Sequence, residues 1–355
     1  MIHARMLVLG VAAALALVVG CTLGVPGSSS KGGVTLLCGR PAGTPNAVGR
    51  LVLRANQCLV VQEPDGRLRQ VFLAAETNVY PALPVWSPDG TRIAFTQQRF
   101  FNGRPGADWG DDLYIVPADG GAPALVRAHT STGEQVQGVA WSGDGSALLF
   151  GDFTPVLKDG LIAAYDGRLK RVDLATKQET TVLEGAFTPS LSRDGKRLAF
   201  MREEGLFIAN ADGTASTQLV PRGRFQTLYF PRISPDGASV VFSASAAAPA
   251  TREAPREVPP PHPREGILAR LAARLFSPRA AEAHGIPMDI WRVDVATKAL
   301  TQLTRFAEDD PFPAWSADGK RLIVFATGGL YEVASDGSSI KTIGPGTFGG
   351  HVDAR

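Results

Sequence analysis

The residues of this chain that could do chemistry recur in a regular pattern. The pattern is Trp or another apolar residue, then Ser, one variable residue, Asp and Gly, followed by an apolar run that ends in Phe. A serine two residues from an aspartate offers a nucleophile near a charged partner, and an aspartate beside a glycine could offer oxygen to a cation. The five copies are Trp86–Phe95, Trp141–Phe150, Leu191–Phe200, Ile233–Phe242 and Trp315–Phe325.

The repetition itself argues against catalysis by these serines. A catalytic serine needs a base held beside it at one place, whereas this serine is present in every copy. An aspartate can bond the backbone of a tight turn, and the following glycine adopts the positive φ that closes the turn. We therefore interpret each copy as the joint between two strands, and we expect a chain without catalytic residues that is not an enzyme.

Metal and nucleic-acid chemistry find little support. The acidic groups Asp108–Asp112 and Glu308–Asp310 lack EF-hand spacing, and we expect them to be solvated loops rather than cation sites. The net charge of +2 gives no basic face for nucleic acid. We expect no metal and no cofactor, because no two histidines have the spacing of a metal-binding pair. The histidines are His3, His129, His262, His284 and His351.

The elements that hold these turns are strands. A repeat of about 40–55 residues built from strands and turns is typical of a β-propeller. The strand after each turn is apolar on both faces, as in Ile93–Phe95, which places it between two layers. A second hairpin follows every copy, and a sixth unit, Leu51–Leu73, lacks only its first strand. We predict an all-β fold, a six-bladed propeller of four-stranded blades.

The missing strand must come from elsewhere in the chain. The segment Gly346–Asp353 stands where a seventh repeat would begin, and we expect it to enter the first blade and close the ring. Closure removes exposed sheet edges. The alternative is a five-bladed ring with a loose N-terminal hairpin.

One interval between copies, from Gly237 to Gly319, is much longer than the others and indicates an insertion in blade 5 at about residues 246–287. Its first part is rich in Pro and Ala, and Glu265–Phe276 has the apolar spacing of a short helix. Three interpretations of the insertion stay open: a solvated segment whose apolar side packs on the blade rim, a helix that docks on a partner or membrane surface, and disorder.

The N-terminus has the features of an export signal. Residues 1–20 contain an apolar run too short to span a bilayer comfortably, and Val18–Cys21 resembles the bacterial lipobox. The resemblance implies cleavage before Cys21 and lipidation of that residue, with residues 21–37 as a flexible tether and the propeller over 38–355. The alternative is a plain secretory signal with an incidental cysteine. An anchored chain would face away from the cytoplasm, on the outer membrane in a Gram-negative host.

Two further cysteines, Cys38 and Cys58, form an even pair in an exported chain. A disulfide between them is the natural expectation. The alternative is two buried free thiols.

The motif Trp86–Phe95, followed by Leu113–Gly121, resembles the TolB-type propeller repeat, and the likeness covers the chain from about Arg50 onward. It implies the fold and says little about activity, because peptidases of the prolyl-oligopeptidase type carry similar propellers. Two departures matter: TolB has an α/β domain before its propeller and is soluble in the periplasm. This sequence also lacks the Gly-x-Ser-x-Gly nucleophile elbow of the peptidases. Function must therefore be inferred from the site.

We expect a binding site at the channel mouth where loops lead into the innermost strands. Aromatic, amide and carboxylate side chains around a concave mouth suit the capture of a peptide or protein loop. Ordinary channel lining is the alternative for any one of them. The predicted residues are Asn78, Tyr80, Gln135, Gln137, Phe187, Gln226, Tyr229, Asp309, Asp310 and His351.

Two functions fit these features. The first is a monomeric, membrane-anchored interaction module that binds a protein or peptide of the cell envelope. The second is a hydrolase, lyase or carbohydrate-binding protein that uses the channel mouth, which would require a deep pocket with paired carboxylates.

Overall fold

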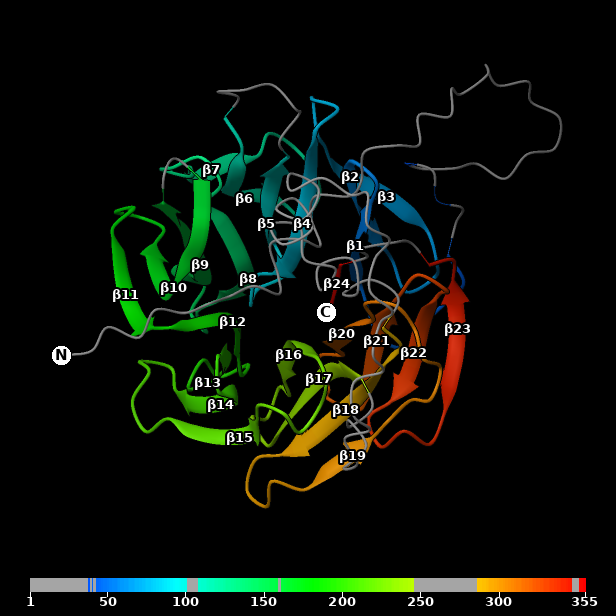
Figure 1. The fold of residues 1–355 in the computed structure, drawn as a ribbon. Helices are drawn as coiled ribbons and strands as arrows, with labels where there is room; N and C mark the ends of the chain where they lie inside the picture. The colour runs from blue at the N-terminus through cyan, green and yellow to red at the C-terminus, as the bar shows by residue number, and fades with distance from the viewer. Residues whose placement is uncertain are drawn as a thin grey trace, which may run out of the picture.

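The computed structural model describes residues 38, 40, 43–100, 108–158, 161–245, 286–346 and 351–355. Within these residues, 24 strands form six four-stranded antiparallel sheets, arranged as blades around a central channel (Figure 1). The described segments contain no helix. The prediction of an all-β, six-bladed propeller is confirmed.

Each blade runs from an innermost strand at the channel to an outermost strand at the rim. In that order, blade 1 has β24 (Val352–Ala354), β1 (Leu51–Ala55), β2 (Cys58–Gln62) and β3 (Leu68–Leu73); blade 2 has β4 (Val79–Trp86), β5 (Arg92–Arg99), β6 (Gly110–Pro117) and β7 (Ala124–Arg127); blade 3 has β8 (Gln135–Trp141), β9 (Ala147–Lys158), β10 (Leu161–Asp173) and β11 (Glu179–Glu184). Blade 4 has β12 (Ala186–Leu191), β13 (Arg197–Arg202), β14 (Gly205–Asn210) and β15 (Thr217–Pro221); blade 5 has β16 (Leu228–Ile233), β17 (Ser239–Ser245), β18 (Met288–Asp294) and β19 (Leu300–Gln302); blade 6 has β20 (Phe312–Trp315), β21 (Arg321–Phe325), β22 (Leu330–Ala334) and β23 (Ile340–Gly344).

The C-terminal strand closes the ring, as predicted. Strand β24 pairs antiparallel with β1, with Val352 opposite Leu53 and Ala354 opposite Leu51. The strand lies at the end of the segment expected from the sequence and extends one residue beyond it. Both termini of the ring therefore meet in blade 1, and the alternative of a five-bladed ring is wrong.

The repeated turns have the structural role expected of them. In all five copies the Ser Oγ donates to the Asp Oδ1 at 2.5–2.7 Å, and it accepts the backbone N–H of the residue five positions ahead. The glycine φ values of 68–72° lie in the left-handed region that glycine adopts without steric cost. Each serine is thus occupied by its own turn.

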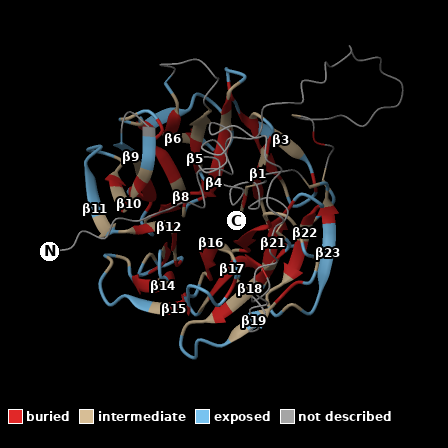
Figure 2. Ribbon diagram, in the orientation of Figure 1, coloured by how far each residue is buried: buried red, intermediate tan, exposed pale blue. Residues whose placement is uncertain are grey.

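The core lies between adjacent blades. The phenylalanines that end the repeats are fully buried, and the inner and middle strands carry most of the buried residues in Figure 2. Outer strands such as β11 and β23 are largely exposed. Burial of these phenyl groups between adjacent sheets stabilises the whole propeller, because each blade covers its neighbours. The buried phenylalanines are Phe95, Phe150, Phe200, Phe242 and Phe325.

The predicted disulfide is present and joins Cys38 to Cys58 of β2, with 6.1 Å between their Cα atoms. It ties the segment before blade 1 to that blade. The signal at 1–20, the tether at 21–37 with Cys21, and almost all of the insertion at 246–287 with its helix lie outside the described residues. In the part of the chain that is described, we find no helix long and apolar enough to cross a membrane.

Candidate binding site at the end of the channel

The innermost strands all run in one direction along the channel. We call the side where these strands begin the start face, and the side where they end the finish face. The sequence predicted a site on the start face, and the structure places those residues there, in or just before β4, β8, β12, β16, β20 and β24.

Only some of the predicted residues are brought together. The Arg54 guanidinium lies 5.6 Å from the ring centre of Tyr80, and the Arg54 amide donates to the His351 carbonyl oxygen at 3.0 Å. The His351 ring packs edge-on against Phe312 at 4.9 Å. Tyr229 lies beside Phe230, whose ring is 4.7 Å from Phe312.

The remaining predicted residues are spread around the start face. Asn78 donates to the Phe100 carbonyl oxygen at 3.4 Å, and Phe187 packs against Phe153 at 5.2 Å. Gln226 is exposed in the loop before β16. These contacts are mostly within or between neighbouring blades.

The first acidic group, Asp108–Asp112, is only partly the solvated loop that was expected, since Asp108 is exposed but Asp111 is not. Asp111 and Asp112 follow Gly110 at the start of β6, and Asp111 is buried and accepts the Val136 amide at 2.9 Å. Asp112 and Asp108 hold His129 at 2.7 and 3.0 Å from its two ring nitrogens. Although burial of the imidazole opposes it, these two hydrogen bonds raise the pKa of His129. The sequence marks this strand by its apolar run from Leu113, whereas β6 begins at Gly110 and so includes Asp111 and Asp112.

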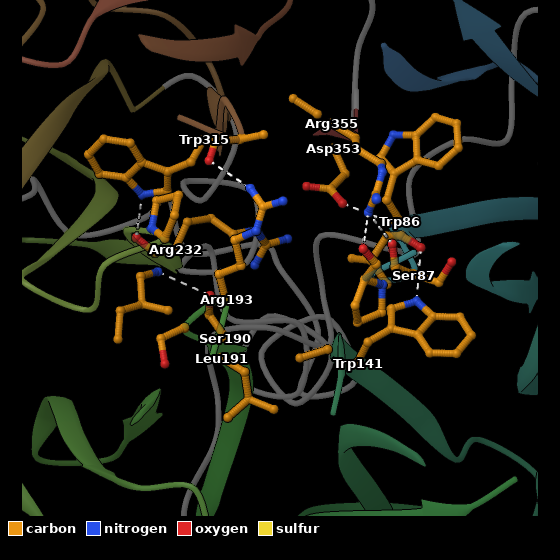
Figure 3. Close-up of a pocket in the computed structure, with 18 of the residues that line it drawn as sticks. Trp86, Ser87, Trp141, Ser190, Leu191, Arg193, Arg232, Trp315, Asp353 and Arg355 are labelled. Atoms are coloured by element: carbon orange, nitrogen blue, oxygen red, sulfur yellow. Dashed lines mark hydrogen bonds between the residues drawn. The ribbon is translucent and has the colours of Figure 1, made fainter. Parts of the chain in front are cut away.

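A cavity of about 200 Å³ opens on the finish face, where the innermost strands end (Figure 3). Its apolar walls include Trp86 of β4, Trp141 of β8 and Trp315 of β20, each less than a tenth exposed. The indole N–H of Trp141 donates to the Val85 carbonyl oxygen at 3.2 Å, and that of Trp315 donates to the Arg232 carbonyl oxygen at 3.0 Å. These bonds cross from blade to blade and fix the walls.

Four charged side chains line this cavity. Figure 3 draws Arg193 and Arg232 on one side of it, and Asp353 and Arg355 on the other. The three guanidinium groups thus face a shared space with one carboxylate. We call Arg193, Arg232, Arg355 and Asp353 the finish-face cluster.

Arg232 is the most buried member of the finish-face cluster, at 9% exposed. Its guanidinium stacks on the Phe312 ring at 4.6 Å and donates to the Pro231 carbonyl oxygen at 3.1 Å. Among the described residues we find no salt bridge to Arg232. Burial lowers the pKa of this guanidinium to about 10, which the charge of Asp353 partly opposes.

Asp353 is the only acidic side chain that lines this cavity among the described residues, and it is partly buried. One of its oxygens accepts the Trp86 amide at 2.8 Å. Burial raises the pKa of Asp353 to about 6, although the Trp86 amide and the charge of Arg232 favour the ionised form. Desolvation therefore outweighs the nearby positive charge.

Arg355 and Arg193 complete the cluster at the rim. The Arg355 side chain crosses to blade 2, where it donates to the Ser87 carbonyl oxygen at 2.8 Å and also to that of Pro88. The Arg193 guanidinium crosses toward blade 6 and donates to the Ala317 carbonyl oxygen at 2.9 Å. Burial and then the charge of Arg193 lower the pKa of Arg355. Both guanidinium groups keep donors available, since each has five N–H groups.

The sequence analysis missed the finish-face cluster, although a signal was present. In the first copy, Val85-Trp86-Ser87-Pro88, the variable position of the turn is Pro88. Most copies have an apolar residue at the position of Trp86 and a small or apolar residue at the position of Val85. Arg232 and Asp353 are the charged residues at that strand position, and Arg193 is the charged residue at the variable position. Arg355 stands where the other copies have serine. The departures from the repeat, rather than the repeat, mark the cavity.

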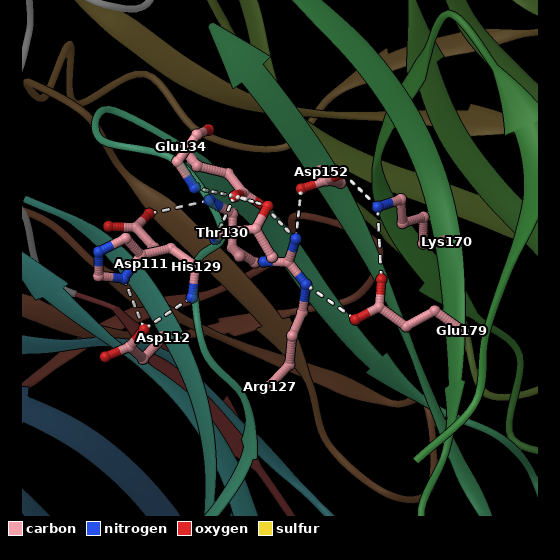
Figure 4. Close-up of polar contacts among 11 residues, drawn as sticks. Asp111, Asp112, Arg127, His129, Thr130, Glu134, Asp152, Lys170 and Glu179 are labelled. Atoms are coloured by element: carbon pink, nitrogen blue, oxygen red, sulfur yellow. Dashed lines mark hydrogen bonds and ion pairs between the residues drawn. The ribbon is translucent and has the colours of Figure 1, made fainter.

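A second polar cluster lies between blades 2 and 3 (Figure 4). Arg127 of β7 forms salt bridges with Glu134, with Asp152 of β9 at 3.1 Å and with Glu179 of β11 at 3.0 Å. Lys170 of β10 lies 2.7 Å from Asp152 and 3.3 Å from Glu179. We call these five residues the inter-blade cluster.

Two carboxylates of the inter-blade cluster are fully enclosed. Glu134 and Asp152 have no exposed side-chain surface, and Glu134 also accepts the Thr130 amide at 2.6 Å. Burial and the neighbouring Glu134 raise the pKa of Asp152. Burial also acts against ionisation of Glu134, but its hydrogen bonds to Asp152 and Arg127 lower the pKa of Glu134. The cluster therefore satisfies its charges internally and joins two blades.

The side chains of the finish face can bind other molecules. Ser87, Ser192 and Ser316 are held by their turns. Ser190 lies on β12 and accepts the Ile233 amide at 3.0 Å. Among the described side chains that line the cavity, Asp353 has no second acidic group beside it. Within the described residues no group of three or more His, Cys, Asp or Glu side chains could hold a metal ion. Indole faces and guanidinium groups bind other molecules by stacking, hydrogen bonding and charge.

Comparison with known proteins gives similarity in structure alone. No family model matches the chain, and no curated protein matches it in sequence. Among solved structures, TolB from Acinetobacter baumannii is 16% identical with a TM-score of 0.58, over 88% of this chain and 68% of that one.

Two further structures show similar folds. A putative TolB from Agrobacterium tumefaciens is 18% identical with a TM-score of 0.50, over 79% of this chain and 88% of that one. A puromycin hydrolase is 17% identical with a TM-score of 0.50, over 85% of this chain but only 44% of the hydrolase. This chain therefore has a TolB-like six-bladed propeller, a fold that also occurs within an enzyme.

Proposed function

We propose that this protein is a non-enzymatic binding module that captures a protein or peptide segment of the cell envelope in the finish-face cavity. The observation that carries the proposal is the cavity itself, which combines three tryptophan walls with three arginines. Aromatic residues and arginine are the side chains that most often dominate binding energy at protein interfaces. A cavity of about 200 Å³ would hold one or two side chains of a partner rather than a whole small-molecule cofactor.

The cellular setting is part of the proposal. The Cys38–Cys58 disulfide is typical of proteins outside the reducing cytoplasm. Together with the lipobox-like Val18–Cys21, it supports an exported protein, anchored to a membrane through lipid on Cys21. The tether of residues 21–37 would then hold the propeller away from the bilayer, as a monomer facing an envelope partner.

The ring of residues predicted on the start face stays a prediction and a second place where a partner could bind. Several of its members pack on neighbouring side chains. The prediction comprises Asn78, Tyr80, Gln137, Phe187, Gln226, Tyr229, Asp309, Asp310 and His351.

A photo-crosslinking amino acid placed at single positions tests the function in intact cells. Leu191 lines the cavity, and Leu125 of the outer strand β7 is 48% exposed and serves as the matched control. We expect a discrete protein adduct from position 191 that is absent from position 125, with the partner identified by mass spectrometry. Adducts at neither position would contradict the proposal, and a ligand consisting only of sugars or other small molecules would favour the enzyme or carbohydrate alternative.

A crosslinker at Gln226 distinguishes the two faces. This residue is exposed on the start face. An adduct there without one at Leu191 would move the site to the ring predicted from the sequence.

A further inference from the structure

We infer that the finish-face cavity recognises a carboxylate of the bound peptide, either an Asp or Glu side chain or the C-terminal carboxylate, with Arg232 as its central ligand and Arg193 and Arg355 at the rim. This inference rests on the proposed function and specifies the chemistry of its ligand.

The first support is the state of Arg232. Its guanidinium has five donors and is enclosed by the fold, yet among the described residues it donates one hydrogen bond, to the carbonyl oxygen of the preceding residue, and pairs with no carboxylate. A buried charge that is neither paired nor fully hydrogen-bonded costs free energy. The cost is offset when an anion enters the cavity beside it.

The second support is the balance of charge. Three arginine side chains share the cavity with one acidic side chain, Asp353, among the described residues, and one Asp353 oxygen already accepts the Trp86 amide. A further carboxylate, Asp89, is hydrogen-bonded by Ser87 and by the Thr91 amide in its turn, and its charge favours the charged form of Arg355. The described side chains that line the cavity therefore carry more positive than negative charge.

The third support is the shape of the walls. The indoles of Trp86, Trp141 and Trp315 flank the arginines on innermost strands from three blades. Such walls pack against the apolar parts of a peptide while a guanidinium binds its carboxylate in a two-pronged arrangement. Recognition would then require both the apolar neighbours and the acid.

A peptide carboxylate fits these features better than a free oxyanion such as phosphate. Phosphate sites commonly use a helix N-terminus or a nest of backbone N–H groups. The described residues lining the cavity lie on strands and strand turns, and their side chains supply the positive charge. Inorganic phosphate is therefore included in the test as a competitor.

The test begins with a random dodecapeptide library selected on the immobilised full-length protein at pH 7.5. We expect the selected peptides to share an acidic residue or to require a free C-terminus. The dissociation constant of one selected peptide is then measured by calorimetry with the acid intact and with the acid replaced by its amide. The same pair is measured on Arg232→Met, on Arg193→Ala and on Arg222→Met.

Arg222 is a matched control, because it lies just after β15, exposed and paired with Glu203 at 3.0 Å. We expect amidation and Arg232→Met each to weaken binding about 10- to 100-fold, and both together to weaken it little more than either alone. Arg193→Ala, whose side chain is exposed, should weaken binding about 3- to 10-fold without affecting folding. Arg222→Met should leave the dissociation constant unchanged.

The outcomes separate the two proposals. If peptides bind and crosslinks form at Leu191, but amidation or Arg232→Met leaves the dissociation constant unchanged, the carboxylate inference is wrong and the proposed function stands. If no peptide is selected and no crosslink forms, both are wrong. If millimolar inorganic phosphate displaces every peptide and binds equally well alone, the ligand is a free oxyanion and the inference is overturned.

Discussion

Two arginine clusters in this propeller differ in one respect, the number of carboxylates that meet them. In the inter-blade cluster, Arg127 and Lys170 are surrounded by three carboxylates, two of them without exposed side-chain surface. In the finish-face cluster, three arginine side chains line a cavity that contains one acidic side chain among its described lining residues. Arg127 and Arg232 are both less than a tenth exposed, so burial alone does not distinguish them.

The difference separates a structural from a binding role. Arg127 is held by charged partners on strands β9 and β11 and on the segment before β8, and three carboxylates already balance its charge. Arg232 is held by a ring and one carbonyl oxygen, and its remaining donors are available. A cluster that neutralises itself joins parts of the fold, whereas one with unmatched charge is suited to bind an external group.

Replacing Arg127 should change the free energy of unfolding more than any other substitution proposed here. Arg127→Met leaves Glu134 and Asp152 buried without their shared cation, which we expect to lower the free energy of unfolding by about 3–5 kcal/mol. Urea denaturation followed by circular dichroism measures this loss, with the exposed Arg222→Met as control, expected within about 0.5 kcal/mol of the original chain. A loss below about 1 kcal/mol would mean that the inter-blade cluster is not a structural joint.

Removing the charge of Asp353 should have an intermediate effect of opposite sign. Because the pKa of Asp353 is raised to about 6, ionising it in the folded protein is unfavourable, and Asp353→Asn should stabilise the protein at pH 7.5 by about 2 kcal/mol. This stabilisation is smaller than the free energy that corresponds to the whole pKa difference between the folded and unfolded states, because the Asp353 side chain is partly accessible to water. The asparagine oxygen can still accept the Trp86 amide.

The pH dependence gives the sign of this effect. An unfolded aspartate titrates near 3.9, so between about pH 4 and 6 the folded protein binds more protons at this site than the unfolded chain does. The stabilisation by Asp353→Asn should therefore shrink as the pH falls from 7 and disappear near pH 4. Asp119→Asn, at a side chain 92% exposed, is the control and should change stability little at any of these pH values.

The sequence predicted the scaffold well because the scaffold repeats. The same turn requires the same Ser, Asp and Gly in each blade that contains it, and the sequence shows these residues in five copies. Closure by the C-terminal strand followed from the one blade that lacked an inner strand, and the disulfide from an even pair of cysteines. Each of these is a local or counting constraint that one sequence contains.

The site could not be predicted in the same way. The environment of Arg232 is formed by residues of other blades, such as Asp353 and Phe312. Spacing along the sequence does not give the distances from Arg232 to these residues. We predicted the site on the start face because aromatic and amide residues occur in the segments that lead into the innermost strands. In the structure several of these pack on neighbours, as Phe187 does on Phe153 and Tyr80 on Phe100 at 5.5 Å.

The smallest expected change in stability is the sharpest test of the comparison, because it applies to Arg232 the substitution already made at Arg127. Arg232→Met removes a buried cation that has no salt bridge among the described residues, and the methionine can keep contact with the Phe312 ring. Replacing a poorly compensated buried charge by an apolar side chain is often neutral or stabilising, so we expect a change within about 1 kcal/mol in urea denaturation at pH 7.5. The bond from the Trp315 indole to the residue 232 carbonyl oxygen is retained, which preserves the cavity wall.

A loss at Arg232 as large as that at Arg127 would show that both arginines are structural and that unmatched charge does not mark a binding site in this protein. Equal stability of Arg232→Met and the original chain, together with loss of peptide binding, would instead separate the two roles within one fold. The pair of variants is informative because the same atoms are removed from two enclosed sites, and the surrounding carboxylates are what differ between them.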